Sequence, residues 1–157
     1  FTNAAWILEH LRLLTSQLNL LIAQLGEAGV CTAATCPVMC AGSLQYLCAS
    51  HSTPQSCPAM DYMVHTVDGA QFLLSSTKEF PSRITVKADG AANFPSVARR
   101  LYRCLGHAWR HHAPVFTAFE ATTSTTARIT ALIRRHRILE EDQLIIPDTE
   151  LPALRRR

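Results

Sequence analysis

The sequence lacks long apolar runs, is poor in aromatic residues and contains no glycine-rich phosphate loop. Aromatic residues make up 7% of its 157 residues. The stretch LNLLIAQL is interrupted by Asn19 and Gln24, so no segment predicts a helix that spans a membrane. Residues 1–9 have no basic start followed by an apolar stretch and do not predict a signal peptide, although a targeting segment before Phe1 stays open. Without a phosphate loop, kinase signature or serine-nucleophile motif, the sequence favours a protein that is not an enzyme.

Composition and charge favour one folded domain with local basic patches. Hydrophobic residues account for 48% of the chain and charged residues for 17%, and the length suits a single core. The formal net charge is only +3. The basic residues gather at 99–110, at 134–137 and in the final RRR. This pattern argues against a surface that binds nucleic acid over the whole molecule.

The spacing of apolar residues predicts a bundle of helices. In the first helix, residues 4–25, one apolar stripe recurs every three or four positions, and Gly26 and Gly29 are expected to stop the helix. The stripe consists of Ile7, Leu11, Leu14, Leu18, Leu21 and Leu25. Pro114 disfavours helical geometry at the preceding residue and should end a later helix near His112. The further helices are predicted at about 59–75, 94–112, 115–122 and 124–137.

The remaining segments predict short strands, loops and a tail. LQYLCA (44–49) predicts a short strand or turn. FPSRITVKADG (80–90) predicts a loop with one short strand, because Ile84 and Val86 alternate with polar neighbours. Residues 1–146 are expected to form one domain, and the polar residues 147–157 a loose C-terminal tail.

The cysteines and histidines raise the question of a metal site. Three disulfides are one interpretation of the six cysteines, but a chain of this length does not need them, so reduced thiols are favoured. VCTAATCPVM places Cys31 and Cys36 on a loop, and GHAWRHH places His107, His111 and His112 at the end of a helix. Two Cys and two His suit zinc. On an ideal helix His111, not His112, shares the face of His107, so either can be the fourth ligand. The alternative is that these histidines are solvated groups at a helix end.

Three arginines form a second candidate site. Arg99, Arg100 and Arg103 lie on one flank of the predicted helix 94–112. Guanidinium groups at this spacing can form a fork for a phosphate. The alternative interpretation is a solvated basic face.

Much of the sequence resembles the Mob/phocein family. The resemblance runs from Trp6 to Pro147 and is closest to the phocein branch, which EHLR, HTVDGA and FPSR also resemble. It is carried by CPVMCAG, by the segment from LCASHSTPQ to SRITVK, by SVARRLYRCLGHAWRHH and by DQLIIP.

The resemblance implies a fold and a metal site. The expected fold is mainly α, a Mob-like helical bundle with one or two short strands and one structural zinc ion held by two Cys and two His. These ligands match Cys31, Cys36, His107 and His112, which selects His112 over His111. Four protein ligands leave no open position for water, so the zinc would be structural rather than catalytic. A zinc hydrolase would need one of those positions open.

The resemblance also implies partners. Phocein-like proteins resemble adaptors of an assembly that joins a striatin-like scaffold, a type 2A phosphatase and germinal-centre kinases, and the family's arginine segment matches a pocket for phosphorylated peptides at Arg99, Arg100 and Arg103. No small-molecule substrate is expected. The implied location is cytoplasmic, with peripheral attachment to Golgi or other endomembranes. Mob members that activate growth-control kinases carry an acidic first helix, whereas this one has only Glu9 and Glu27. Direct kinase coactivation and a nucleic-acid-binding zinc domain remain the alternatives.

Overall fold

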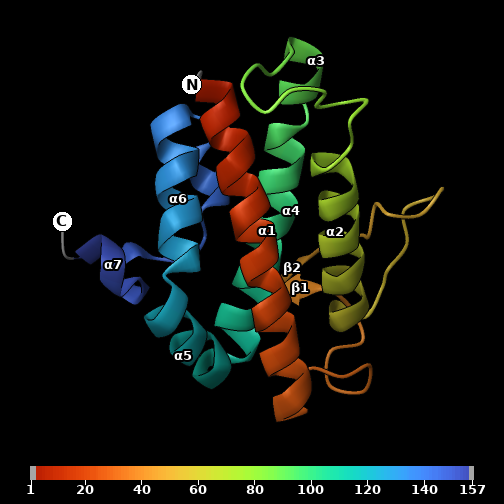
Figure 1. Ribbon diagram of the computed structural model, residues 1–157. Coiled ribbons are helices and arrows are strands. Elements are labelled where there is room, and N and C mark those ends of the chain that lie inside the picture. Colours follow the sequence, from red (N-terminus) through yellow and green to blue (C-terminus); the bar gives the residue numbers. More distant parts are fainter. Residues whose placement is uncertain (1–2, 156–157) are drawn as a thin grey trace.

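Helix α1 (Asn3–Ala28) runs the length of the molecule and packs against most of the other long helices (Figure 1). The computed structural model describes residues 3–155. The predicted apolar stripe of α1 is buried along its whole length. The helix continues through Gly26, which is not among the glycines with positive φ, and it ends before Gly29, whose φ of +68° lies in the left-handed region.

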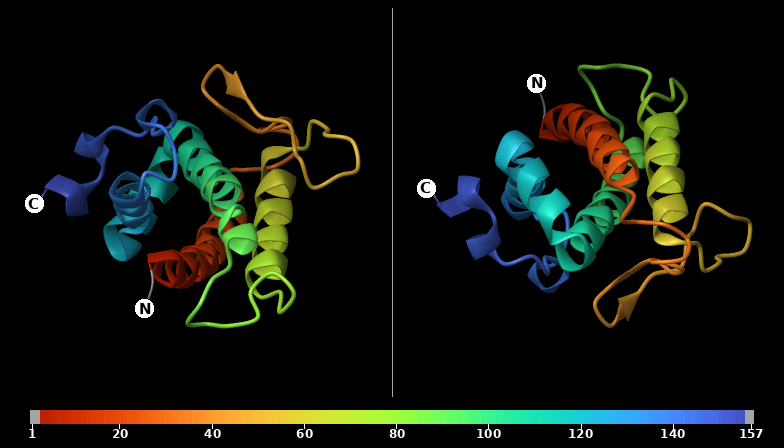
Figure 2. Two further views of the ribbon diagram at one scale, coloured as in Figure 1. Left: turned by 90° about the horizontal axis from the view of Figure 1, so that it is seen from above. Right: turned by 90° about the horizontal axis from the view of Figure 1, so that it is seen from below.

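The other long helices lie close to their predicted positions. Helix α4 runs in the direction of α1, while α2 and α6 run in the opposite direction (Figures 1 and 2). Pro114 ends α4 as predicted and occupies the first turn of the next helix, where no backbone N–H is needed. The mainly α fold is therefore confirmed. The bounds are Ala59–Leu74 for α2, Phe94–His111 for α4, Ala113–Thr123 for α5 and Thr125–His136 for α6.

A buried carboxylate joins α5 to α6. Ser124, between the two helices, has a φ of +52° and makes no side-chain cap. Glu120 of α5 is 2% exposed, and its two carboxylate oxygens accept the backbone N–H groups of Thr126 at 2.8 Å and Ala127 at 2.9 Å. These are otherwise unpaired donors in the first turn of α6. Glu120 therefore supplies the cap that the residue before the helix does not provide.

The strands are short, and one predicted strand is wrong. β1 (Cys40–Ala41) and β2 (Leu44–Gln45) form an antiparallel hairpin, and Cys48 forms an isolated bridge with Gln55. Residues 80–87 form neither helix nor strand, and α3 (Ala88–Ala91) follows them. The hydroxyl of Ser82 accepts the N–H groups of Ile84 and Thr85. These bonds turn the backbone locally in place of strand pairing.

The C-terminal segment returns to the bundle where a loose tail was expected. Short 3-10 turns at Glu141–Gln143 and Asp148–Glu150 precede α7 (Pro152–Arg155). Leu151 is fully buried, and the phenol of Tyr102 accepts the N–H of Ile146 at 2.9 Å. Arg134 of α6 forms ion pairs with Glu141 and Asp148. The segment up to residue 155 is thus tied to α4 and α6.

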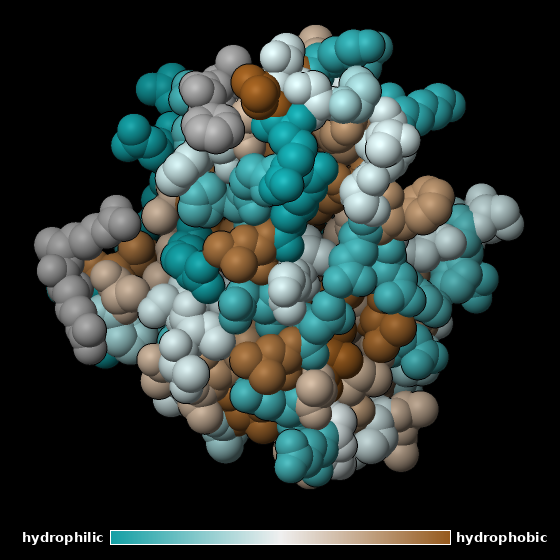
Figure 3. All heavy atoms as spheres, in the orientation of Figure 1, coloured by the Kyte–Doolittle hydropathy of each residue, from teal (hydrophilic) through white to brown (hydrophobic). Residues whose placement is uncertain are grey.

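The outer face of α1 is partly apolar. Leu13 and Leu20 are exposed, and Figure 3 shows brown areas over this helix between teal and white ones. Glu9, one of its two acidic residues, forms ion pairs with Arg12 and with Arg83. Within residues 3–155, no helix combines the length and the apolar character that crossing a bilayer requires.

Candidate metal centre

Four side chains from two segments far apart in the sequence, the loop after α1 and the end of α4, lie close together. Cys31 and Cys36 lie in the loop after α1, His107 lies in α4, and His112 is the residue that ends α4. Each offers one ligand atom, and all four atoms lie within 4.8 Å of one another. All four residues are buried. The structure thus brings together the four residues expected from the sequence.

The loop between the two cysteines is built by local hydrogen bonds. The N–H of Thr32 donates to the hydroxyl of Thr35, and the N–H of Thr35 donates to the hydroxyl of Thr32. The N–H of Cys36 then donates to the carbonyl of Thr32 at 2.8 Å. These bonds fold residues 31–36 into a tight turn, so both thiols point to the same place without help from a sheet.

A backbone carbonyl fixes the ring of His107. Its Nδ1 lies 2.7 Å from the carbonyl oxygen of Cys40 and donates its proton to it. The other nitrogen, Nε2, is therefore the unprotonated one, and it lies 3.6 Å from Sγ of Cys31. A metal-binding histidine commonly has its second nitrogen held in this way. The ring is fixed in the tautomer that can bind a metal.

The distances between the donors fit a tetrahedral ion. Zinc bonds of about 2.3 Å to sulfur and about 2.05 Å to nitrogen, at tetrahedral angles, place S and N about 3.6 Å apart. Sγ of Cys31 and Nε2 of His107 are 3.6 Å apart, and Sγ of Cys36 and Nε2 of His112 are 3.5 Å apart. These two of the four Cys–His edges of the cluster therefore have the length that a zinc ion requires.

The structure distinguishes His112 from His111. His112 has φ −136° and ψ 52°, so the chain leaves its helical course there and the side chain turns into the cluster. His111 stays on the helix, and its Nε2 accepts the N–H of Gly42 at 3.1 Å. It could form only a three-donor group with Cys40 and His107. His111 thus holds the β hairpin against α4, while His112 completes the four-donor group.

Burial tunes the protonation of the cluster. Burial, together with the neighbouring Cys36, raises the pKa of the Cys31 thiol to about 12. Burial also lowers the pKa of His107 to about 4 and lowers the pKa of His112. Both imidazoles are therefore neutral near pH 7, as ligands must be, whereas the Cys31 thiol needs a cation before it ionises. Four protein donors would fill a tetrahedral site, so the chemistry this group supports is cross-linking rather than catalysis.

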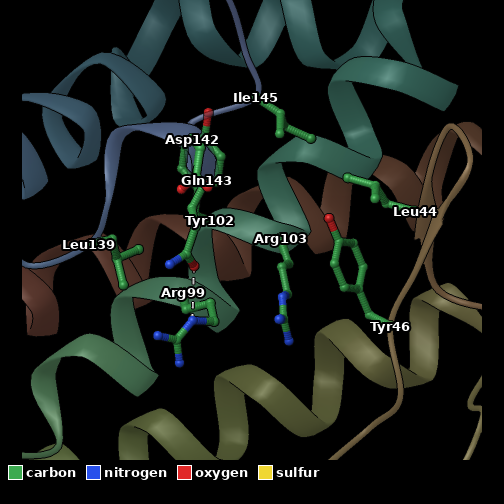
Figure 4. Close-up of a pocket in the computed structure, with 9 residues that line it drawn as sticks. All are labelled: Leu44, Tyr46, Arg99, Tyr102, Arg103, Leu139, Asp142, Gln143 and Ile145. Atoms are coloured by element: carbon green, nitrogen blue, oxygen red, sulfur yellow. Dashed lines mark hydrogen bonds between the residues drawn. The ribbon is translucent and has the colours of Figure 1, made fainter.

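The three predicted arginines do not share one site. Arg99 and Arg103 line a cavity of about 190 Å³ between α4, β2 and residues 139–145, whereas Arg100 is not among its lining residues (Figure 4). Nε of Arg99 donates to Oε1 of Gln143 at 2.9 Å, and the guanidinium of Arg103 lies 4.5 Å from the ring centre of Tyr46. The structure thus places two of the three arginines together.

Other residues of this cavity were missed from the sequence. Asp142 also lines it, although Figure 4 shows both guanidinium groups on the side away from that carboxylate. Tyr46 and Gln143 lie far from the arginines in sequence, so helical spacing gave no signal for them. A second group of possible metal ligands, Cys48, His51, Cys57 and His65, was also missed. The signal in the sequence was the spacing of Cys48 to His51 and of Cys57 to His65 within the short segment 48–65.

Comparison with known proteins agrees with this architecture. The Mob1/phocein family model matches residues 2–147. The "MOB kinase activator-like 4" of Drosophila melanogaster and the "MOB-like protein phocein" of Caenorhabditis elegans are each 41% identical over 146 residues, covering 92% of this chain and 65% of their own length. The "Maintenance of ploidy protein mob1" of Schizosaccharomyces pombe is 33% identical over 123 residues, 73% of this chain and 57% of its own. The chain thus spans 65% of the length of the first two relatives.

Proposed function

Because this chain belongs to the Mob1/phocein family, we propose that it is a non-enzymatic adaptor, cross-linked by a structural zinc ion, that docks kinases and a phosphatase complex. The observation that carries the proposal is the buried group of four donors, Cys31, Cys36, His107 and His112. Its ligand set suits a closed zinc site that holds the loop after α1 against the end of α4. Such a site stabilises a docking surface and has no position for a reacting water.

The partners we propose are a striatin-like scaffold, a type 2A phosphatase and germinal-centre kinases. Identity supports the phocein branch, since it is 41% to the relative named phocein and 33% to the one named for maintenance of ploidy. The surface of α1 supports it as well. Glu9 is paired with Arg12 and Arg83, and Leu13 and Leu20 are exposed, so this helix offers an apolar face rather than an acidic one. An apolar face suits a scaffold helix better than a basic kinase segment.

A second candidate function is direct activation of a kinase. The name of the Drosophila relative, a MOB kinase activator-like protein, favours it. The two functions differ in what the purified chain does by itself. A coactivator raises the rate of a purified kinase, whereas an adaptor changes only which proteins the kinase meets.

A phosphorylated peptide is the ligand we propose for the cavity beside α4. Arg99 and Arg103 are four residues apart on one face of the helix, so both side chains line the same cavity. Gln143 and Tyr46 hold the two side chains, which reduces the conformational entropy that binding would cost. A phosphate carries nearly two negative charges and three acceptor oxygens, which match such a pair. The structure favours Arg99 and Arg103 for this role over Arg100.

The test measures partners and phosphopeptide together. The tagged chain is purified from cells and its partners are identified by mass spectrometry, with Arg103→Gln and Arg99→Gln beside Arg135→Gln as the control. Arg135 is exposed on α6, and it is preferred to Arg134 as the control because Arg134 forms ion pairs with Glu141 and Asp148. We expect striatin-like and phosphatase subunits with the intact chain. We also expect a phosphothreonine peptide to bind ten- to a hundredfold more weakly to the two cavity variants, in accordance with the loss of one charge-assisted bond of about 1.5–3 kcal/mol.

Four results would contradict parts of the proposal. Recovery of unrelated proteins would reject the phocein-like role, and a higher rate of a purified kinase would favour coactivation. Steep salt-dependent binding of DNA or RNA by the purified chain would favour a nucleic-acid-binding zinc domain. If both cavity variants bind the phosphopeptide as the Arg135→Gln control does, the arginines are a solvated face.

A further inference from the structure

A second group of four metal-ligand side chains lies beside the first turns of α2. Cys48, His51 and Cys57 come from the loop that precedes the helix, and His65 comes from the helix itself. Their ligand atoms all lie within 4.8 Å of one another. The loop is the yellow segment that projects beside α2 in Figures 1 and 2. None of these residues belongs to the cluster at the end of α4.

The distances within this group bracket the edge of a zinc tetrahedron. Sγ of Cys48 lies 3.6 Å from Nδ1 of His65, and Sγ of Cys57 lies 3.1 Å from Nε2 of His51 and 3.9 Å from Nδ1 of His65. The expected S–N separation is about 3.6 Å. The two imidazole rings meet edge to face, with centres 5.0 Å apart. Each ring thus directs one nitrogen at the pair of thiols.

Backbone hydrogen bonds position the thiols before any metal arrives. The N–H of Cys48 donates to the carbonyl of Gln55 at 2.7 Å, and the N–H of Gln55 donates back at 3.2 Å. The N–H of Met39 donates to the carbonyl of Cys57 at 3.1 Å. These bonds close the loop so that the side chains of Cys48 and Cys57 face His65. The site is therefore preorganised, as a structural metal site in a short loop needs to be.

An ordinary core does not explain this group. Cys48 is 1% exposed and Cys57 is 6% exposed, as buried thiols in an apolar core would be. The loop between them, however, is exposed from residue 49 to 56 apart from the half-buried His51. The interior of the loop thus consists of two thiols and two imidazoles rather than apolar side chains. Polar groups gathered in this way are stabilised when they bind a common ion.

We propose that Cys48, His51, Cys57 and His65 bind a second zinc ion, independent of the one proposed at Cys31, Cys36, His107 and His112. All four ligands lie within residues 48–65, so this site holds a single loop closed instead of joining distant helices. The two sites are joined by a backbone hydrogen bond, because the carbonyl of Cys36, a ligand of the first site, accepts the N–H of Ala59, two residues after Cys57, at 3.1 Å. One ligand of the second ion, Cys48, lies just after the β hairpin and two residues beyond Tyr46. The ring of Tyr46 contacts Arg103, so the second ion anchors the segment that carries this ring.

The test counts zinc in the purified chain. The protein is kept reduced, passed through metal-free buffer and analysed by mass spectrometry for zinc per chain. We expect two zinc ions in the wild type, one in Cys57→Ser, one in His107→Ala and none in the double variant. Cys104→Ala is the matched control, since Cys104 is a fully buried thiol outside both groups, and it should keep both ions.

A second measurement covers a variant that fails to fold. Zinc is replaced by cobalt, whose absorption bands report thiolate ligands and tetrahedral coordination. The variant is His51→Ala, because His51 is only half-buried and lies in the loop. We expect the wild type to bind two cobalt ions and His51→Ala to lose the bands of one. One metal ion per wild-type chain, or two ions retained in both Cys57→Ser and His51→Ala, would overturn the proposal. The His107→Ala variant reports on the first site separately, so the proposal for one site can be rejected without rejecting the proposal for the other.

Discussion

Replacing His107 with alanine tests how much the proposed zinc ion at the end of α4 contributes to the stability of the fold. Both Cys–His pairs of that cluster are separated by 76 positions in the chain. A cross-link that closes a loop of this length stabilises the fold by about 4.5 kcal/mol through the entropy of the unfolded chain. The variant also loses the hydrogen bond to the carbonyl of Cys40, worth about 1 kcal/mol. We therefore expect the variant to lose about 5 kcal/mol of unfolding free energy.

The assay is thermal unfolding followed by circular dichroism, with and without a zinc chelator. For a chain of this size about 5 kcal/mol corresponds to a fall in Tm of roughly 10–20 °C. His111→Ala is the matched control, because His111 lies outside the four-donor group, and loss of its hydrogen bond from the N–H of Gly42 should lower Tm by about 2–4 °C.

The effect of the chelator decides whether the loss comes from the metal. In the wild type and in His111→Ala, the chelator should lower Tm by the stability that the metal at the end of α4 contributes, plus that of any other bound metal. In His107→Ala it should lower Tm by roughly 9–18 °C less, because this site is already lost. An equal chelator effect in wild type and His107→Ala would refute a metal-dependent cross-link here.

Two further predictions concern the carboxylates of Glu120, which caps α6, and of Glu9, which pairs with Arg12 and Arg83. Glu120→Ala removes both acceptors for the N–H groups of Thr126 and Ala127 and should lower the unfolding free energy in urea by about 3 kcal/mol, whereas an unchanged value would show that water replaces the cap. Arg83 and Arg12 lower the pKa of Glu9 below its ordinary value of 4.5, so its stabilising effect is present above that value and is lost as the pH falls through the lowered pKa. The small stability difference between wild type and Glu9→Gln, measured in urea, should be present at pH 7 and absent at about pH 2, and a difference that persists in acid would contradict this.

Helical periodicity predicted the parts of the fold that depend on burial of one face. The stripe of α1 is continuous, so its burial followed from spacing alone. The strand expected around Ile84 failed because alternation of two residues does not provide a partner strand. Ile84 is 66% exposed, and the hydroxyl of Ser82 satisfies its backbone N–H instead. The docking of the C-terminal segment was missed because a single apolar residue, Leu151, fills a space that only the folded bundle creates.

The sequence predicted the candidate sites only in part, because helical spacing does not determine the backbone at a helix end or the residues that other elements contribute. The choice of His112 depends on the backbone angles of one residue where α4 ends, whereas helical spacing alone left His111 and His112 both open. For the arginines, spacing puts Arg100 about 100° from Arg99 but only about 60° from Arg103, so it could not exclude Arg100 from the site. The residues that complete the cavity, Gln143 and Tyr46, come from other elements. Their position depends on tertiary packing, which a helical pattern does not contain.

The separation of the ligands at the end of α4 also sets an order in time. At synthesis rates of about 5–20 residues per second, the 76 positions between Cys31 and His107 take roughly 4–15 s to emerge. During that interval the two thiols have no imidazole partners, and the apolar stripe of α1 has no α4 to cover it. If zinc binds there as proposed, the loop after α1 is fixed against α4 only once His112 has emerged, while α5 and α6, which also contact α1, are still to follow. The proposed ligands at residues 48–65 all emerge before His107, so the second site is complete in the nascent chain before the first one.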